Sequence, residues 1–322
     1  MIYGLPYKGS KNKLVKKISD LLPPAMNFYD VFCGGCAMSH WAFLSGKYKF
    51  IIANDINEMM PKAFERALNG DFNNESRWIS REEFFRLKNT DPYVALCFSF
   101  SCNLSDYCYG RDIEPYMKAL HYAIFWQNTG LWKELCPETY NSLNAVMLSE
   151  SDRHKRRLLA SDSIISALLS GLSEGSIGHS VLGKPIYKNI KDHPIRLINA
   201  QHLDRILAVQ KTLQKKTSNT DVPHLIISNK NYYEMHFWHD GIIYCDPPYK
   251  NTRRYFNIPP FDYERFYQWC EQQELPVYIS ECSMPENRFV PIAEFTVTRK
   301  PSALTPTVYH ERLWRPICQL DT

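Results

Sequence analysis

The chain has 322 residues, of which 44% are hydrophobic, and its formal net charge is +4. This length can bury one large core or two unequal domains. The chain contains no uninterrupted apolar run of about eighteen residues, which a membrane-spanning helix needs. Its first residues, MIYGLPYKGSKNKL, lack the apolar segment of a signal peptide. We therefore expect a soluble, cytoplasmic protein with no membrane partner.

Ten cysteines are spread along the chain, mostly among apolar residues. In a chain without an export signal, this distribution favours free thiols in the core over a disulfide framework. Cys33 and Cys36 have the spacing of a redox or zinc pair, but no second pair and no close pair of histidines completes a metal set. We expect no metal site.

The first part of the chain predicts alternating helices and strands. Residues 10–22 have helical spacing, with Ser10 as the cap, and two prolines end the pattern. Residues 28–32 (FYDVF) predict a buried strand, the turn Cys33-Gly34-Gly35 leads into a helical pattern, and residues 49–54 (KFIIAN) predict a second strand. This order is typical of a parallel, doubly wound sheet.

The middle of the chain, residues 58–222, has a different character, with long helical patterns, aromatic-rich turns and a clear helix over 196–216. We expect an inserted, mainly helical domain here, between segments 1–57 and 223–322 of one other domain. Between Arg153 and Lys216 the insertion carries twelve Lys or Arg against four Asp or Glu. This excess predicts either a phosphate-binding patch or a solvated helix face.

Strand patterns resume after the insertion. They cover residues 224–228, 241–245, 277–280 and 295–298, with a helical pattern over 262–274 between the second and the third. Together with the N-terminal strands, they predict an α/β fold with a doubly wound, mostly parallel sheet. The sheet is split in the sequence by the helical insertion.

Several ends of the predicted strands carry residues suited to a ligand. Ligands of doubly wound sheets bind beyond the carboxyl ends of the strands, so we expect the turn 32–36, Asp55 and Asp246 to line one crevice. Asp55 follows Gly34 by twenty-one positions, a separation typical of a carboxylate that holds the ribose of an adenosine-bearing cofactor. Considered alone, the glycines are also consistent with an ordinary turn between a strand and a helix that binds no cofactor.

The stretch Asp246-Pro247-Pro248-Tyr249 directly follows the predicted strand 241–245. Consecutive prolines end a strand and remove two backbone donors, so the stretch presents a carboxylate, backbone carbonyls and an aromatic ring. A carboxylate and a carbonyl can each accept one N–H of the exocyclic amine of adenine, while a ring stacks on the base. Positioning and electrostatics then supply most of the catalysis. These four residues are therefore candidate catalytic residues.

Four stretches together resemble the DNA adenine methyltransferase family (Dam-like, class alpha, with a DPPY motif): PYKGSKNKL, YDVFCGGCAM, IIANDIN and DPPY. The resemblance implies a Rossmann-like enzyme that transfers a methyl group from S-adenosylmethionine to the exocyclic amino group of a flipped adenine in double-stranded DNA. It also implies that the cofactor site lies in 1–57, that 58–222 is a target-recognition domain and that 223–322 carries the catalytic motif.

The resemblance assigns these residues to the S-adenosylmethionine site: Tyr7, Lys11, Asp30, Phe32, Gly34, Cys36, Asp55, Ile56, Asn231, Tyr232 and Asp246. It implies that Tyr7 packs against the cofactor, that Lys11 contacts it and that Asp55 binds its ribose. Cys36 stands at the second glycine position of the family's loop, and Asn231 stands where the family usually has an acidic residue near the adenine ring.

Two groups of residues are candidates for DNA binding. Lys250, Arg253 and Arg254 lie just beyond the catalytic motif and are suited to phosphates beside a flipped nucleotide, with a solvated loop as the alternative. Asn103, Tyr109 and Arg111 resemble the family's hairpin that enters a DNA groove. Arg and Asn commonly read guanine and adenine, whereas aromatic residues at turns more often pack.

Other functions share parts of this pattern. Methyltransferases that act on RNA or on protein glutamine have a similar motif, which usually begins with Asn rather than with an acid such as Asp246. A nicotinamide-dependent dehydrogenase would use the same crevice, but a full GxGxxG is absent. Cys36 and Asn231 leave open a DNA-binding protein with a degenerate cofactor site. The sequence determines neither the recognition site nor whether a cognate restriction enzyme completes a restriction-modification pair.

Overall fold

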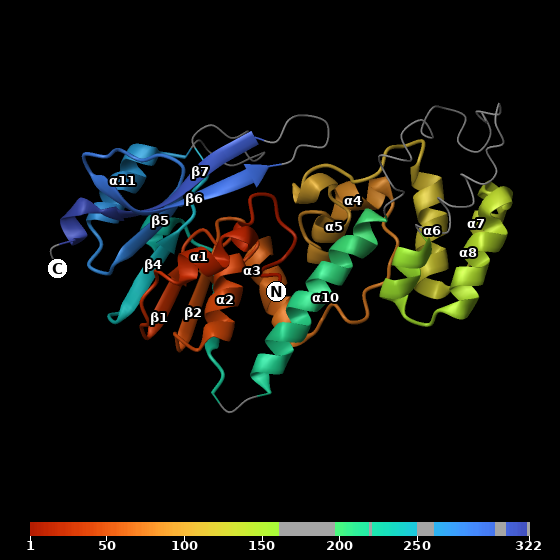
Figure 1. Cartoon of the computed structure of the whole chain (residues 1–322), viewed down its shortest axis with the longest axis horizontal. Coiled ribbons are helices and arrows are strands. Elements are labelled where there is room, and N and C mark those ends of the chain that lie inside the picture. Colours follow the sequence, from red (N-terminus) through yellow and green to blue (C-terminus); the bar gives the residue numbers. More distant parts are fainter. Residues whose placement is uncertain (161–196, 219–220, 250–260, 300–306, 321–322) are drawn as a thin grey trace. The chain divides into compact units, whose positions relative to one another are not determined.

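The computed structural model describes residues 1–160, 197–218, 221–249, 261–299 and 307–320 (Figure 1). The chain divides into two compact units. Unit 1 consists of Met1–Phe72 and Ile206–Thr322, and unit 2 consists of Asn73–Arg205. The division falls inside helix α10, Ile198–Thr217.

Within the described ranges, unit 1 is built on a seven-stranded sheet with the order β3-β2-β1-β4-β5-β7-β6. The strands are β1 (Asn27–Asp30), β2 (Phe50–Asn54), β3 (His224–Ser228), β4 (Gly241–Cys245), β5 (Val277–Glu281), β6 (Phe289–Arg299) and β7 (Thr307–Pro316). Strands β3, β2, β1, β4 and β5 are parallel, and β7 pairs antiparallel with β5 and β6. The expected α/β fold with a mostly parallel sheet is confirmed and is consistent with a Rossmann-like methyltransferase.

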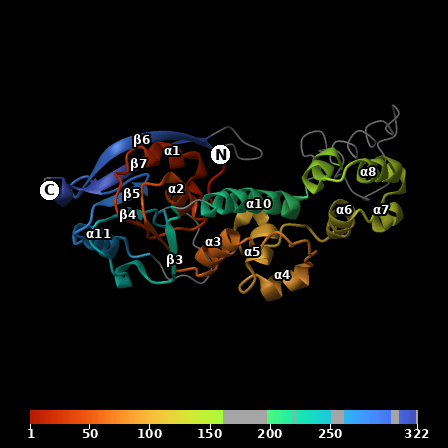
Figure 2. The ribbon, with the colours of Figure 1, turned by 90° about the horizontal axis from the view of Figure 1, so that it is seen from below.

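Helices cover both faces of this sheet. Successive side chains of a strand point to opposite faces, so neighbouring residues of one strand pack against different helices. Phe28 of β1 packs edge-on against Trp41 of helix α2 (Ala37–Ser45), with ring centroids 6.2 Å apart. The next residue, Tyr29, lies in a buried cluster with Phe266 and Trp269 of helix α11 (Tyr263–Glu271). Figure 2 shows both helices beside the strands. The central strand β1 is therefore enclosed from both sides.

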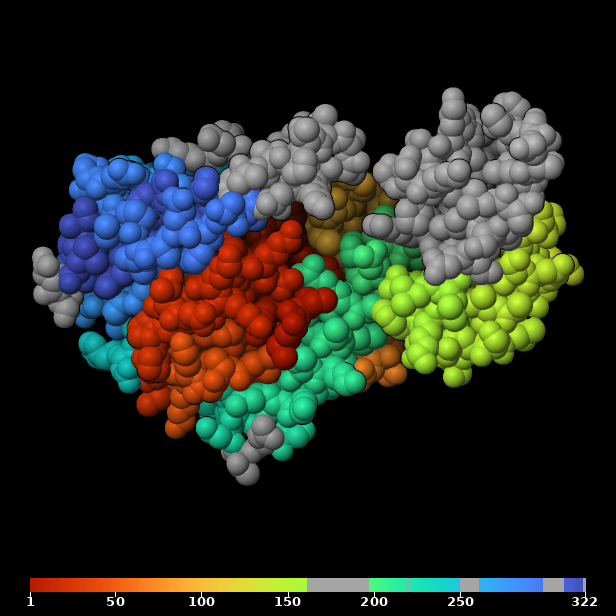
Figure 3. Space-filling model, viewed as in Figure 1, coloured from red at the N-terminus to blue at the C-terminus, as the bar shows by residue number. Residues whose placement is uncertain are grey.

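The N-terminal segment differs from its prediction. Instead of one helix over 10–22, it forms the 3-10 turn η1 (Lys11–Lys13) and the short helix α1 (Val15–Ser19), and Ser10 makes no capping hydrogen bond. Lys11 is turned inward and is only 7% exposed. A buried ammonium group needs partners. On the surface of unit 1, the N-terminal part of the chain (red) lies next to the C-terminal part (blue) (Figure 3).

The C-terminal hairpin was predicted only in part. Strand β6 extends well beyond the predicted 295–298, and β7 is absent from the prediction. A register shift between Pro291 and Ala293 interrupts the alternation of β6. On β7, an inward-facing position is taken by Glu311, which is 1% exposed. Neither strand therefore shows the apolar pattern of period two by which strands are recognised.

The helical elements of unit 2 are α4 (Arg81–Leu87), α5 (Pro92–Cys97), η2 (Phe100–Cys102), α6 (Glu114–Trp126), α7 (Gly130–Leu135) and α8 (Pro137–Ser149). Unit 1 adds α3 (Met59–Asn69), η4 (Tyr232–Glu234) and η5 (Ile317–Gln319). Sequence signals start two of the helices: Ser80 forms a capping box with Glu83, and Asp91 caps α5 before a proline. The limits 58–222 and the recognition role of this insertion stay predictions.

The seven buried cysteines are free thiols, as expected: Cys33, Cys36, Cys97, Cys108, Cys136, Cys245 and Cys270. Among the described helices, none is both long enough and apolar enough to cross a membrane. Within the described ranges, no group of three His, Cys, Asp or Glu side chains is placed to hold a metal ion.

Gly241, the first residue of β4, gives a test of the central strand pairing. A Cβ atom there would lie 2.9 Å from the Tyr29 ring and 3.2 Å from the Asn27 carbonyl oxygen. We expect Gly241→Ala to lower the free energy of unfolding by about 1–3 kcal/mol, because it overpacks a closed core. Urea-induced unfolding measures this loss.

Gly110→Ala is the matched control, because its Cβ would meet only Ile113 at 3.9 Å, an ordinary contact. Equal urea midpoints for the two variants would show that the pairing of β1 and β4 tolerates a methyl group and that this packing analysis is wrong.

Candidate active site

Three carboxylates follow neighbouring strands at the same end of the sheet. Asp30 is the last residue of β1, Asp55 comes directly after β2, and Asp246 comes directly after β4. Strand β1 lies between β2 and β4, where the strand order reverses and where ligands of such sheets bind. Burial and, after it, the Asp246 and Asp55 carboxylates raise the pKa of Asp30. The three carboxyl groups therefore share one electrostatic environment.

Tyr7 covers the glycine turn that follows β1. A Cβ atom at Gly34 would lie 2.8 Å from the Tyr7 ring, and one at Gly35 would lie 2.9 Å from the Leu5 carbonyl oxygen. Gly34 also has a φ of 44°, in the left-handed region that favours glycine. The Leu5 N–H donates to the Gly35 carbonyl at 2.7 Å. The two glycines thus allow the N-terminal segment to approach the turn closely.

Asp55 holds this turn from the neighbouring strand. One carboxylate oxygen accepts the Gly34 N–H at 2.8 Å, and the other accepts the Asn57 N–H at 2.9 Å. Asn229 donates to the carbonyls of Asp55 and Ile56 at 2.8 and 3.0 Å. Burial raises the pKa of Asp55. Asp55 therefore positions the turn, a role that sequence reasoning did not predict, and its ribose contact stays a prediction.

Cys36 has a φ of 55° immediately before helix α2, a conformation that favours glycine. Its side chain is fully buried, with its Sγ 3.4 Å from Cys33 Sγ. Burial raises the pKa of both thiols, so both are neutral. A cofactor contact at Cys36 would have to use its backbone, because the thiol points into the core.

Asp30 is 1% exposed and bonds the first turn of α2. Its Oδ2 atom accepts the Ser39 N–H at 3.0 Å and the Ser39 hydroxyl at 2.6 Å. Burial raises the pKa of Asp30 to about 7 in spite of these bonds. A nearby positive charge would favour the ionised form of such a group. Asp30 is therefore suited to a cationic ligand.

Phe32 and Tyr232, predicted from opposite ends of the chain, meet in an aromatic cluster with ring centroids 5.6 Å apart. Phe266 contacts both rings, with its centroid 5.7 Å from that of Phe32 and 5.5 Å from that of Tyr232. The N–H of the adjacent Asn231 donates to Glu234 at 3.2 Å. The structure thus brings the three predicted residues into one region of unit 1. Their contact with an adenine ring stays a prediction.

The segment after β4 is anchored by Lys11. Its Nζ atom lies 2.8 Å from Asp246 Oδ1 and 3.0 Å from Glu311 Oε1. Lys11 also donates to the Tyr249 hydroxyl, which in turn lies 2.9 and 2.7 Å from the two Glu311 oxygens and donates to them. Ser280 of β5 donates to Glu311 Oε1 at 2.7 Å. We call these five residues the Lys11 network.

The charges of this network follow from its burial. Burial raises the pKa of Asp246 to about 6, and Lys11 opposes the rise. Burial lowers the pKa of Lys11, but the negative charges of Asp246 and Glu311 raise it by more than burial lowers it. The net pKa of Lys11 therefore lies above its ordinary value, and Lys11 is a cation. Burial and the two carboxylates raise the pKa of Tyr249, which keeps the phenol neutral. Above about pH 6, the network presents an ionised Asp246.

The backbone of the motif is held from helix α11. Tyr263 donates its hydroxyl to the Pro248 carbonyl at 2.7 Å. This bond fixes the chain between Asp246 and Tyr249 and engages one of the carbonyls that the prolines expose. The carbonyl of Pro247 is the other carbonyl of the proline pair.

Tyr109 packs in the interior of unit 2. It is 2% exposed, its hydroxyl donates to Asn199 at 2.8 Å, and its ring stacks on Trp78 with centroids 5.7 Å apart. These contacts agree with the interpretation that Tyr109 packs in the interior, and not with the one that it enters a DNA groove. A contact with DNA is not available to Tyr109 in this conformation.

The other predicted DNA-binding residues fall into two classes. Asn103 is half-buried and accepts the Ser105 N–H at 2.9 Å, which closes a local turn, and Arg111 is exposed. Both are in unit 2. Three more candidates, Lys250, Arg253 and Arg254, lie outside the described residues.

Arginines at the start of the basic segment are engaged within unit 2. Arg153 and Arg157 both pair with Asp204, the latter at 2.8 Å. Arg156 is 5% exposed and donates to the Ile124 carbonyl at 2.9 Å. These three side chains therefore contribute to the packing of unit 2, and they do not support the phosphate-binding interpretation of this segment.

Sequence reasoning missed Glu311, Ser280 and Tyr263, which hold the predicted motif in place. Glu311 carries one recognisable signal, since it stands two positions before the buried Leu313, where alternation in a strand would call for an apolar residue. A carboxylate at such a position is almost never fully buried unless it is paired. That signal becomes visible only once β7 is known to be a strand.

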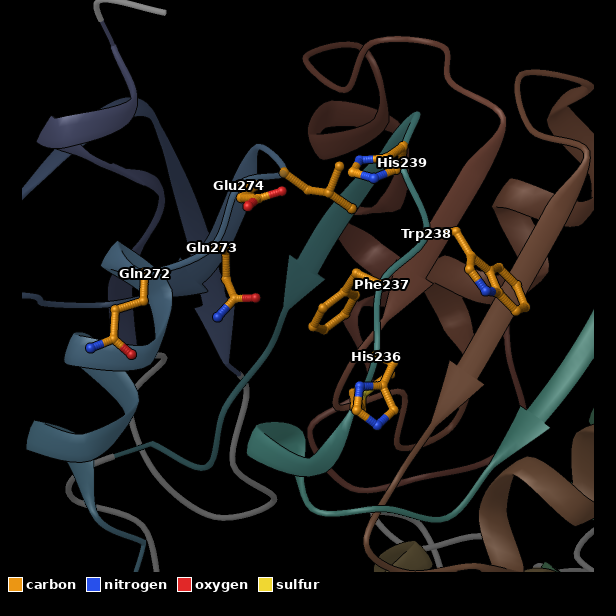
Figure 4. A pocket seen from close by; sticks show the side chains of 9 residues that line it. His236, Phe237, Trp238, His239, Gln272, Gln273 and Glu274 are labelled. Carbon is orange, nitrogen blue, oxygen red and sulfur yellow. The ribbon is translucent and has the colours of Figure 1, made fainter.

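A pocket of about 300 Å³ lies at the opposite ends of the strands. It is lined by residues 235–239, which precede β4, and by residues 272–275, which precede β5. Figure 4 shows side chains from both stretches around it, including His236 and Gln273. No predicted site residue is among its lining residues, so the pocket is separate from the crevice at the carboxyl ends.

The N-terminal third of the chain matches a known family. Residues 7–106 match the family of D12 class N6 adenine-specific DNA methyltransferases. The matched range includes Lys11, the glycine turn and Asp55, and it ends before the catalytic motif at Asp246. The match over these residues supports the adenine methyltransferase family that the sequence resembles.

The raised pKa of Asp30 predicts a pH dependence of stability. Because its folded pKa of about 7 lies above the ordinary 3.8, the favourable contribution of the protonated group is lost as the pH rises towards 7. Relative to Asp30→Asn, we expect the wild type to lose on the order of 1 kcal/mol per pH unit across this window. Urea unfolding at several pH values measures the difference.

Asp20→Asn serves as the control, because Asp20 is exposed and its replacement removes the same charge. We expect its stability to follow that of the wild type at every pH. If the curve for Asp30→Asn also runs parallel to the wild-type curve, Asp30 is not held with a raised pKa.

Proposed function

We propose that this chain is an S-adenosylmethionine-dependent DNA methyltransferase that modifies the exocyclic amino group of adenine. One observation carries the proposal. Lys11 lies within the segment that matches the family, and Asp246 lies outside it, yet the two form an ion pair of 2.8 Å. The catalytic motif expected from the sequence is thus in direct contact with the part of the chain that matches the family model.

The crevice has features that fit the cofactor. Gly34 and Gly35 let Tyr7 and Leu5 pack closely against the turn after β1, which is the turn that we assign to the cofactor. The Asp30 carboxyl group is buried, and burial raises the pKa of both Asp30 and Asp55, so both suit a ligand that carries positive charge. When bound, S-adenosylmethionine supplies a methyl group activated by its sulfonium charge. Asp30, the glycine turn and Asp55 are the residues that we assign to hold it.

Asp246 and its neighbours are assigned to the target base. The ionised Asp246 accepts one N–H of the exocyclic amine, and the carbonyl of Pro247 accepts the other. These two bonds orient the nitrogen, whose lone pair is otherwise delocalised into the ring. The Tyr249 ring stacks on the base. Lys11 favours the ionised form of Asp246 through its positive charge, against the effect of burial.

A base within a duplex has to leave the helix to reach such a site, at a cost of a few kcal/mol. We propose that the enzyme flips the adenine out and binds the duplex around it. Arg111 of unit 2 is exposed and suited to this contact, as are Lys250, Arg253 and Arg254 next to the motif. The recognition sequence and a cognate restriction enzyme are left open.

The experiment that tests the proposal incubates the pure protein with unmethylated plasmid DNA and S-adenosylmethionine. Single-molecule sequencing then scores modified adenines in their sequence context, and binding of radiolabelled cofactor is measured separately. Methyladenine within one short sequence supports the proposal. Cofactor binding without modified adenine points to RNA or protein as the substrate, and the absence of both points to a DNA-binding protein with a degenerate cofactor site.

Asp246→Ala is expected to reduce methyl transfer to well below about a tenth of the wild-type rate, because the group that orients the amine is lost. Cofactor and DNA binding should change little. In the wild type, the rate should rise with pH through about 6, because the ionised carboxylate is the active form and burial raises the pKa of Asp246 to that value. Initial rates between pH 5 and 8 test both statements.

Asp221→Ala, which changes an exposed carboxylate, is the control and should keep the wild-type rate. A variant at Asp246 with more than about a tenth of the wild-type rate, or a flat pH profile, would show that Asp246 does not have the assigned role.

Asp55→Ala is expected to raise the KM for S-adenosylmethionine far more than it lowers the rate at saturation. The variant loses the proposed ribose contact and also the bond that holds Gly34 at 2.8 Å. Asp55→Asn keeps one acceptor for that bond, so it should raise KM less. Steady-state kinetics with varied cofactor distinguish the two effects, and an unchanged KM in both variants places Asp55 outside the cofactor site.

A further inference from the structure

Glu311 is a buried charged residue that neither the family match nor the sequence motifs include. It lies on β7 and is 1% exposed. A carboxylate in this position is costly unless its oxygens accept hydrogen bonds and a counter-charge is close. Glu311 has both: the Ser280 and Tyr249 hydroxyls donate to it, and the Lys11 ammonium lies at 3.0 Å.

We propose that Glu311 is a positioning residue for the methyl transfer: it holds the Tyr249 ring ready to stack on the target base and keeps Lys11 in place when Asp246 turns to the adenine amine. This inference rests on the proposed function.

The first part of the proposal concerns the orientation of the Tyr249 ring. The Tyr249 hydroxyl donates to both oxygens of Glu311, at 2.9 and 2.7 Å, so the far end of the ring is fixed to β7. The near end is fixed by the backbone after Pro248, whose carbonyl accepts from Tyr263. A ring held at both ends has lost its rotational freedom before the base arrives. Otherwise, part of the binding free energy of the base would be used to order this ring.

The second part concerns Lys11. Its ammonium lies between two carboxylates, 2.8 Å from Asp246 and 3.0 Å from Glu311. The N–H of a bound adenine would compete with Lys11 for the lone pairs of Asp246. Glu311 is a second anion for the Lys11 ammonium, and the base does not contact it. Lys11 can therefore lose part of its interaction with Asp246 and still remain in the site, paired with Glu311.

The position of Glu311 also affects Asp246 directly. Burial raises the pKa of Asp246 first, Lys11 lowers it, and the negative charges of Glu311 and Asp55 raise it further. Glu281 of β5 is a further carboxyl group near this site, and burial followed by the Asp246 and Glu311 charges raises its pKa to about 8. If Glu311 loses its charge, Lys11 pairs with Asp246 alone and the pKa of Asp246 falls. A residue that acts through this network therefore shifts the pH profile of the reaction, whereas a purely structural residue does not.

Glu311→Gln is the variant that separates these roles, because it keeps the size of the side chain and one acceptor for the hydroxyls. We expect kcat to fall by about tenfold to a hundredfold, the loss typical of misplaced catalytic groups. The KM for S-adenosylmethionine should stay within about twofold of the wild type, since the contacts of Glu311 are Lys11, Tyr249 and Ser280, and not Asp30, the glycine turn or Asp55, which we assign to hold the cofactor. The acidic limb of the pH profile should move to lower pH.

A double-mutant cycle with Tyr249→Phe tests whether Glu311 acts through the hydroxyl. In the Tyr249→Phe background, Glu311→Gln should cost clearly less than in the wild type, because the bond between the two residues is already absent. DNA with 2-aminopurine at the target adenine gives a readout that does not need turnover. We expect a weaker stacking signal for Glu311→Gln than for the wild type.

Glu294→Gln is the control for the change of charge alone. Glu294 lies on the neighbouring strand β6, is exposed and pairs with Arg312 at 2.7 Å. This variant should keep the wild-type rate and pH profile. Thermal unfolding of both variants shows whether they are folded, and Glu311→Asp is the second variant if Glu311→Gln is not.

Additive effects in the cycle, together with an unshifted acidic limb and an unchanged 2-aminopurine signal, would overturn the role of Glu311 while leaving the proposed function intact. A wild-type protein that methylates no adenine in the same assay overturns the proposed function, and the inference about Glu311 with it. Coupling between the two substitutions in the cycle, together with an acidic limb shifted to lower pH, supports both the role of Glu311 and the proposed function.

Discussion

The site depends on one buried ammonium group placed between two carboxylates. Lys11 lies 2.8 Å from Asp246 and 3.0 Å from Glu311, and it also donates to the Tyr249 hydroxyl. The positive charge of Lys11 lowers the pKa of Asp246, against the effects of burial and of the Glu311 charge. The ion pair therefore determines the charge of the catalytic motif and also joins the N-terminal turn, the end of β4 and strand β7 into one structure.

The same end of the sheet holds more negative charge than Lys11 can offset. Asp30 and Asp55 are ionisable groups in the same crevice, and burial raises the pKa of both. A positively charged ligand would favour the ionised forms of these carboxyl groups. Binding and folding stability are linked in this arrangement, because a ligand that binds only the folded chain stabilises it. The charge of the crevice thus indicates the kind of ligand, and the glycine turn sets how closely it can approach.

The parts of this structure that were predicted are those with local signals. The predicted strands 224–228 and 241–245 have the observed limits of β3 and β4, because continuous apolar residues end at prolines or polar residues there. Asp246 and Tyr249 were found from a rare motif. Glu311 could not be found, because its burial depends on Lys11 at the other end of the sequence and its charge hides the strand pattern of β7. The inward turn of Lys11 was missed for the same reason: a helical pattern is local, and the carboxylates that bind the ammonium are not.

The C-terminal hairpin has a consequence for the order in which the molecule can assemble. The ribosome makes the N-terminal segment first, so Lys11 emerges long before its partner on β7, and contacts between residues so distant in sequence form late in folding. The N-terminal strands can pair with each other early, but the Lys11 network needs the last strand of the sheet. A nascent chain that already contains Asp246 and Tyr249 therefore still lacks the carboxylate that contacts Lys11 and Tyr249, and the geometry of the proposed catalytic motif forms only when β7 enters the sheet.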